Sequence, residues 1–158
     1  MRILIYSYNY NPELIGIAPL MTELAEGFAK RGHQVRVVTG MPNYPERKVY
    51  DGYEGKFFLT EEQNGVTVQR SYIHVRGSKP GVLDRLLLDG SFIVSSLWQA
   101  FNGWKPEIIF ATTPPLLISL PVSFYGLFSH SSVVLNIQDI VSEAAVRVGL
   151  LKKDSWIV

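Results

Sequence analysis

The chain has 158 residues, of which 47% are apolar and 18% are charged, and its formal net charge is +1. This composition is that of a folded domain with a sizeable core and argues against intrinsic disorder. The small net charge, with no basic stripe, gives no argument for a nucleic-acid partner, and the lack of cysteine excludes a disulfide scaffold or a thiolate metal site.

The chain opens directly on an apolar run, with no basic region and signal-peptide core ahead of it. The longest apolar stretch, residues 114–128, contains Pro121 and is shorter than the ~20 residues of a bilayer span. We therefore expect a cytoplasmic protein. Trp156, Ile157 and Val158 are apolar within an unfinished amphipathic pattern, which leads us to expect that the chain is part of a longer protein.

The first forty residues predict a strand, a helix and a second strand. The apolar run 3–5 is typical of a strand buried on both faces. Apolar side chains then recur with the spacing of one helix face, at Leu20, Met21, Leu24, Ala25, Phe28 and Ala29. Pro19 suits the first helical turn, and Gly32 suits the left-handed residue after the last turn. Residues 35–38 form the next strand, so loop 9–17 lies where βαβ units bind ligands.

The middle of the chain predicts a hairpin followed by a long helix. Residues 40–55 are rich in Pro, Gly and Asn, which is typical of a loop. Strands are expected over 56–60 and 66–75, joined through 61–65, because Asn64-Gly65 is a strong hairpin signal. The alternation along the second of these strands predicts one solvated face. An apolar pattern over 82–104 predicts a helix with a kink or break near Gly90.

The last third continues the alternation of strands and helices. We expect a strand over 108–111, a nearly all-apolar helix over 116–128, a strand over 133–137 and a helix over 144–151. The fold class predicted is α/β: a Rossmann-like, doubly wound, mostly parallel sheet with helices on both faces and a β-hairpin excursion. The loops 9–17, 40–46, 112–115 and 138–143 then meet at the ligand-binding edge.

The residues in these loops allow two interpretations each. Gly16 supplies an unusual backbone angle or lets a phosphate approach closely. Asp139 and Glu143 favour the positive end of a helix, or they face a sugar hydroxyl and accept its proton. Thr112 caps the following helix or binds a ligand, and Tyr44 is a rim aromatic or a stacking platform for a sugar.

Three kinds of site are disfavoured. Neither the Gly-x-Gly-x-x-Gly fingerprint nor the P-loop Gly-Lys-Thr/Ser occurs, which argues against dinucleotide and P-loop nucleotide binding. His74 and His130 have no partners at metal-ligand spacing, so no metal site is predicted.

Five motifs in order carry a family resemblance. They are the run from Tyr10 through Pro12, Glu13 and Gly16, the segment Arg-Gly-His-Gln-Val-Arg-Val-Val-Thr at 31–39, Pro-Asn-Tyr-Pro at 42–45, Thr-Thr-Pro-Pro at 112–115, and Asn-Ile-Gln-Asp-Ile at 136–140 with Glu143. Over nearly the whole chain the sequence resembles the amino-terminal domain of the GT-B retaining glycosyltransferases of family 4. More narrowly, it is similar to the branch typified by colanic-acid-type exopolysaccharide glycosyltransferases.

The resemblance implies a two-domain enzyme with its active site between two Rossmann-like halves. Residues 1–158 would be the amino-terminal, acceptor-side domain, and a carboxyl-terminal domain of the same protein would hold the donor. The enzyme would transfer a sugar from a nucleotide-sugar donor to a lipid-linked or polysaccharide acceptor, with retention and with neither metal nor cofactor. This chain alone is expected to fold but not to catalyse. The alternative is a non-catalytic Rossmann-like ligand-binding module.

The resemblance also implies where the site lies. Asp139 and Glu143 would be the catalytic residues, Gly16 would approach the donor diphosphate, and the acceptor would be bound by Asn9, Glu13, Tyr44, Thr112 and Gln138. The family's His-Asp pair is Gln138-Asp139 here, and its Gly-Gly pair is Gly16-Ile17.

The resemblance further implies peripheral contact with the inner face of the membrane, because family members often act there. Exposed basic and apolar side chains would support such contact, namely Arg76, Lys79, Arg85, Leu86 and Leu87. The periodicity by itself favours a core position for the two leucines.

Overall fold

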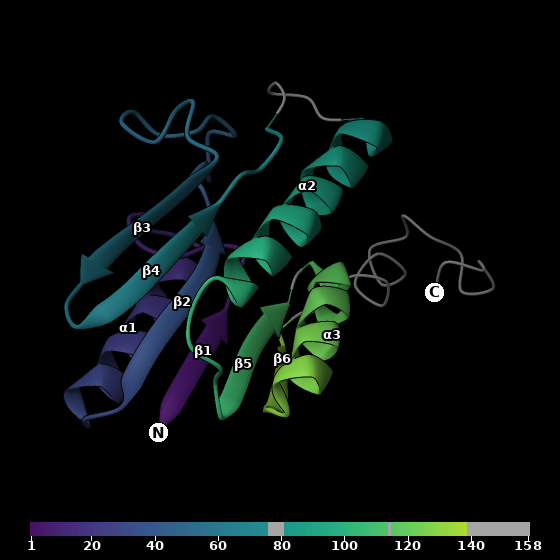
Figure 1. Ribbon diagram of the computed structural model, residues 1–158. Coiled ribbons are helices and arrows are strands. Elements are labelled where there is room, and N and C mark those ends of the chain that lie inside the picture. Colours follow the sequence, from purple (N-terminus) through teal and green to yellow (C-terminus); the bar gives the residue numbers. More distant parts are fainter. Residues whose placement is uncertain (76–80, 114, 139–158) are drawn as a thin grey trace.

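The computed structural model describes residues 1–75, 81–113 and 115–138, which form one α/β domain around a six-stranded sheet (Figure 1). The strands are β1 (Arg2–Tyr6), β2 (Gln34–Gly40), β3 (Phe58–Gln63), β4 (Val66–Ser71), β5 (Ile108–Thr113) and β6 (Ser132–Ile137). The helices are α1 (Ala18–Lys30), α2 (Val82–Phe101), the short 3-10 helix η1 (Leu116–Ile118) and α3 (Ser119–Ser129).

The sheet has the order β3-β4-β2-β1-β5-β6, and every pairing is parallel except that of β3 with β4. The chain first builds outward from β1 through β2 to the hairpin, and then returns to add β5 and β6 on the other side of β1. The order therefore reverses between β1 and β5, which is the switch point where doubly wound sheets bind ligands. The predicted Rossmann-like fold class is confirmed.

Each face of the sheet has its own core. Ile3, Ile5, Val35 and Val37 pack under α1 on one face. Leu4, Tyr6 and Val38 pack with Phe92 of α2 and Tyr125 of α3 on the other. Because successive side chains of a strand point to opposite faces, the continuous apolar run of β1 supplies both cores.

The hairpin is tighter than predicted. Asn64 and Gly65 both have positive φ, 50° and 81°, and form a two-residue turn that leaves β3 paired as far as Gln63. The expected solvated face of β4 is wrong, since Val68, Gln69 and Arg70 are all buried. The expectation failed because α1 covers the β4 valines, the end of α2 covers Gln69, and Arg70 is enclosed by the loop after β1, Glu61 and the Tyr53 ring.

The helices also depart from the sequence pattern. α2 runs unbroken through Gly90 and ends at Phe101 rather than 104. Arg36 explains this end, because its guanidinium donates to the carbonyls of Gln99, Ala100 and Trp104. The predicted helix over 116–128 is η1 followed by α3. In α1, Leu20 is 55% exposed instead of buried.

Candidate functional site

A cavity of about 450 Å³ lies at the switch point, beyond the carboxyl ends of the parallel strands. The loops after β1 and β2 form one side, and the first two turns of α2 form the other. Its wall consists of Tyr8, Asn9, Asn43, Tyr44, Arg47, Val75, Asp84, Arg85, Leu88, Asp89 and Pro115. The two predicted loops 9–17 and 40–46 therefore do meet at one site.

Glu13 joins these two loops. Its side chain is 2% exposed, and one carboxylate oxygen accepts the backbone N–H groups of Asn43 and Tyr44, each at 2.8 Å. The other oxygen accepts the side-chain amide of Asn9 at 2.8 Å. Glu13 is thus a buried acceptor for three donors and does not line the cavity. It positions Asn9 and Tyr44, which do.

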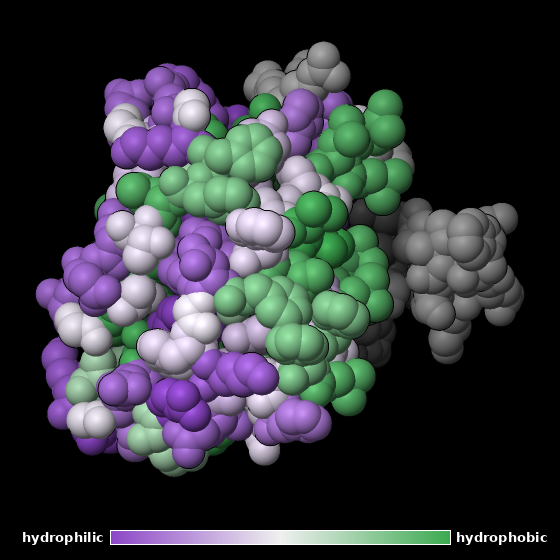
Figure 2. Space-filling model, in the orientation of Figure 1, coloured by the Kyte–Doolittle hydropathy of each residue, from purple (hydrophilic) through white to green (hydrophobic). Residues whose placement is uncertain are grey.

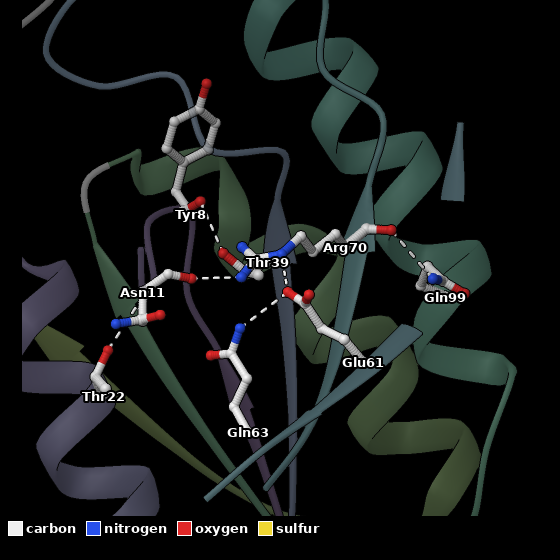
Figure 3. Close-up of polar contacts among 8 residues, drawn as sticks. All are labelled: Tyr8, Asn11, Thr22, Thr39, Glu61, Gln63, Arg70 and Gln99. Carbon is white, nitrogen blue, oxygen red and sulfur yellow. Dashed lines mark hydrogen bonds and ion pairs between the residues drawn. The ribbon is translucent and has the colours of Figure 1, made fainter. Parts of the chain in front are cut away.

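A second network fastens the same loop to the sheet (Figure 3). Arg70, at the carboxyl end of β4, donates to the backbone carbonyl of Asn11 and forms an ion pair with Glu61. The N–H of Asn11 donates to the hydroxyl of Thr22 in α1 at 3.2 Å. The loop after β1 is therefore tied both to β4 and to α1, so the cavity wall is preorganised.

Gly16 lies at the exposed end of this loop with φ of +69°, a conformation that favours glycine. A Cβ at this position would lie 3.8 Å from a ring carbon of Tyr44, which is an ordinary contact. The backbone angle therefore suffices to explain the glycine, and packing inside the described part of the chain does not require it.

Charges of both signs line the cavity. Arg47 and Arg85 contribute cations, and Asp84 and Asp89 contribute carboxylates. Burial raises the pKa of Asp89, and the neighbouring Arg85 opposes that shift. Asp84 accepts the N–H of Gly81 at 3.0 Å and so closes the first turn of α2.

Tyr8 adds an unsatisfied hydroxyl to the wall. Its ring packs edge-on against Phe92 with centroids 5.0 Å apart, and its buried Oη has no hydrogen-bond partner among the described residues. Burial, followed by the charges of Asp89 and Glu13, raises the pKa of this phenol. Figure 3 shows the ring pointing away from the Arg70 network. A neutral hydroxyl, with the Asn43 side chain beside it, therefore lies in the wall of the cavity.

The remaining predicted residues lie elsewhere. Thr112 is buried at the end of β5, and its hydroxyl finds no partner and caps no helix within the described residues. Gln138 is exposed just after β6. Neither is among the described residues that line the cavity. Asp139 and Glu143 lie outside the described residues.

The sequence patterns missed the charged part of the wall. Arg47, Asp84 and Asp89 carry no motif, and Arg85 was considered only for membrane contact. The signal that could have found Asp84, Arg85 and Asp89 is their position in the first two turns of a helix that starts near the switch point. Among the described residues, no group of three or more His, Asp or Glu side chains is arranged to hold a metal.

Comparison with known proteins agrees with this architecture. The model of the glycosyl transferase 4-like domain matches residues 16–148. The chain is 38% identical over 155 residues to a protein of Escherichia coli (strain K12) named as a colanic acid biosynthesis glycosyl transferase, WcaI. The alignment covers 97% of this chain and 38% of that relative, so the chain spans about two fifths of the relative's length. With the Rossmann-like sheet and the cavity at its switch point, this match shows that the chain belongs to the glycosyl transferase 4-like domain family.

Proposed function

We propose that this chain is the acceptor-side domain of a glycosyltransferase. The enzyme transfers a sugar from a nucleotide-sugar donor to a lipid-linked or polysaccharide acceptor, with retention and without a metal. The carboxyl-terminal domain of the same protein holds the donor, and the reaction takes place at the cytoplasmic side of the membrane.

The observation that carries the proposal is the cavity at the switch point in a chain of this family. Its wall combines an aromatic ring, an amide and charges of both signs, as recognition of a sugar requires: hydroxyls pair with carboxylates and amides, and ring faces stack on aromatics. The name of the E. coli relative, which assigns it to colanic acid biosynthesis, supports a polysaccharide product.

The described residues suggest a division of tasks. Asn9, Asp84 and Asp89 bind acceptor hydroxyls, and Tyr44 stacks on a sugar ring. Arg47 and Arg85 bind a phosphate group of a lipid-linked acceptor through charge-assisted hydrogen bonds.

The exposed, left-handed backbone at Gly16 leaves room for the donor diphosphate. Asp139 and Glu143 remain the proposed catalytic carboxylates, and Thr112 and Gln138 remain proposed substrate-binding residues.

The test is a transfer assay with the protein's full natural chain, a panel of nucleotide sugars and lipid-linked acceptors. Arg47→Gln should raise the acceptor KM by about tenfold to a hundredfold, the value of one charge-assisted hydrogen bond, with little change in kcat. Lys30→Gln is the matched control, because Lys30 is exposed at the end of α1 and away from the cavity.

Two outcomes would overturn the proposal. One is a protein that neither transfers nor binds any nucleotide sugar but still binds a saccharide in the cavity, which would favour the non-catalytic binding module. The other is an acceptor KM unchanged in Arg47→Gln, which would remove the cavity from the acceptor site.

A further inference from the structure

A second hollow, of about 570 Å³, adjoins the cavity at the switch point. Residues 46–49 of the loop after β2 form one side of it, and residues 72–75, which follow β4, form the other. Arg47 and Val75 line both the cavity and this second space, which we call the outer hollow. The two spaces are therefore neighbours in one groove, and each is large enough to hold a small ligand.

The loop that builds the outer hollow is unusually long. Residues 41–57 connect β2 to β3 without a helix or strand, and irregular connections longer than about 12–15 residues are mostly functional when they are ordered. The hydroxyl of Tyr50 in this loop donates to the carbonyl of Tyr44, a wall residue of the cavity, at 2.6 Å. On the opposite side, the N–H of His74 donates to Ser91 of α2 at 2.8 Å. Both sides of the outer hollow are thus fixed, which lowers the cost of binding a ligand there.

An aromatic surface borders the outer hollow. Tyr72 lines it, and the Tyr72 ring stacks on that of Phe57 with centroids 4.5 Å apart and an angle of 3° between the planes. Phe57 is itself 60% exposed, so the rest of the described chain does not cover this pair. Aromatic rings beside hydrogen-bonding side chains suit a ligand with both apolar C–H groups and hydroxyls, as a sugar ring has.

The charges around the outer hollow favour a neutral ligand. Residues 46–54 carry three carboxylates and two cations, namely Glu46, Asp51 and Glu54 with Arg47 and Lys48. The ammonium of Lys48 lies 3.5 Å from the carboxylate of Asp51 and 3.3 Å from that of Glu54, so its charge is balanced within the loop. This arrangement argues against an anionic ligand, while Glu46 offers an acceptor to hydroxyl groups.

A lipid chain is also a poor match for the outer hollow. Residues 46–48 are exposed and charged, and Figure 2 shows hydrophilic residues over this loop, in contrast to a hydrophobic area over α2 and α3. In that area Leu86 is 57% exposed and Leu87 is 42% exposed, so the core position that periodicity favoured for these two leucines is wrong. Burying a lipid chain against the charged loop would cost the hydration of its side chains.

We propose that the outer hollow binds the second sugar of the acceptor, so that the enzyme prefers an acceptor with at least two sugars. This inference rests on the proposed function. The sugar that receives the transferred group lies in the cavity, and the next sugar lies in the outer hollow, against Tyr72 and with a hydroxyl on Glu46. Arg47, at the junction, donates to the group that follows the first sugar: a phosphate in a one-sugar acceptor, and a hydroxyl of the second sugar in a longer one.

The test compares acceptors of two lengths in the transfer assay with the full natural chain. The one-sugar probes are farnesyl diphosphate carrying glucose or galactose, and the two-sugar probes are the same lipid carrying cellobiose or lactose. Each pair shares its terminal sugar, so only the second sugar differs. The two-sugar acceptor should have a KM at least about tenfold lower than its one-sugar partner, the value of one hydrogen bond to a charged group.

Three variants locate the preference. Glu46→Ala should raise the two-sugar KM by about tenfold and by at least about five times more than the one-sugar KM, because Glu46 lines the outer hollow and is not among the residues that line the cavity. Tyr72→Ala should act in the same direction through the lost ring contact. Arg47→Gln should raise both KM values, because Arg47 lines both spaces. Glu23→Ala, exposed on α1, is the matched control and should change neither.

The outcomes separate this inference from the proposed function. Equal KM values for the two lengths, or an equal effect of Glu46→Ala on both, would overturn the outer hollow as a sugar subsite and leave the proposed function standing. Absence of transfer to every acceptor would overturn the proposed function and the subsite with it. If thermal unfolding shows that Tyr72→Ala is destabilised, the exposed Glu46 decides the question, since its replacement removes no buried contact.

Discussion

Replacing Glu13 by alanine should destabilise the protein strongly. The buried carboxylate accepts two backbone N–H groups and one amide, each at 2.8 Å, and the variant leaves all three donors without it. A hydrogen bond to a charged group contributes about 1.5–3 kcal/mol. The three are not additive, because water from the cavity can reach part of the emptied space, so we expect a loss of about 3–5 kcal/mol in the free energy of unfolding.

Urea unfolding followed by circular dichroism measures this loss. With a slope of about 2 kcal/mol/M, the midpoint should fall by roughly 2 M. Glu13→Gln keeps one oxygen for the two backbone donors and should cost only about 1–2 kcal/mol. The amides of Asn43 and Tyr44 should exchange hydrogen faster in the alanine variant.

Glu23→Ala supplies the control, because Glu23 is exposed on α1 and should change stability by less than about 0.5 kcal/mol. A Glu13→Ala midpoint no different from that of Glu23→Ala would refute the reasoning. The two loops would then be held together by something other than this carboxylate.

Three further predictions concern the sheet and the cavity. Arg36→Ala should cost about 3–5 kcal/mol in urea unfolding, because the buried guanidinium holds the last carbonyls of α2, and a cost under about 1 kcal/mol would contradict that role. Gly126→Ala should destabilise by about 1–3 kcal/mol despite the better helix propensity of alanine, because a Cβ there would overlap a methyl group of Val133, and a gain in melting temperature would refute this packing. Asp89→Asn should raise the melting temperature at neutral pH, because it removes a carboxylate whose charge is less favourable in the folded state than in the unfolded state. The raised pKa of Asp89 means that the unchanged protein loses stability as the pH rises from the unfolded-state pKa through the folded-state pKa. The difference should vanish at pH values below both, and a difference that persists there would contradict the assignment to this carboxyl.

Much of the fold followed from local patterns. The apolar run at Ile3 predicted a strand buried on both faces, and Asn64-Gly65 predicted the hairpin. Both predictions depend on the chain within a few residues, which is why they were reliable. The end of α2 was predicted less well, because Arg36 determines it from a strand that is distant in the sequence. β3 extends to Gln63 because the turn takes only Asn64 and Gly65.

The candidate site was predicted in outline only. The sequence predicted that loops 9–17 and 40–46 lie at one edge of the sheet, and the structure confirms that they meet there. Glu13 was expected to bind substrate, but its three donors come from both loops, and no spacing in the sequence pairs it with Asn43 or Tyr44. Arg47, in the loop after β2, and Asp89, in α2, are far apart in the sequence and line the same cavity only in the folded protein.

The sequence by itself determined the alternation of strands and helices and the family, since these follow from local periodicity and from motifs in order. Only the tertiary structure decided which side of α2 faces water. Periodicity shows that a helix has an apolar side, but it cannot show where that side points when the neighbouring strands offer polar partners. Here Ser95, Ser96 and Gln99 point inward, because they form hydrogen bonds with the backbone carbonyls of Tyr72 and Arg70 and with the hydroxyl of Tyr6. The exposed leucines of α2 and Trp98 therefore face outward.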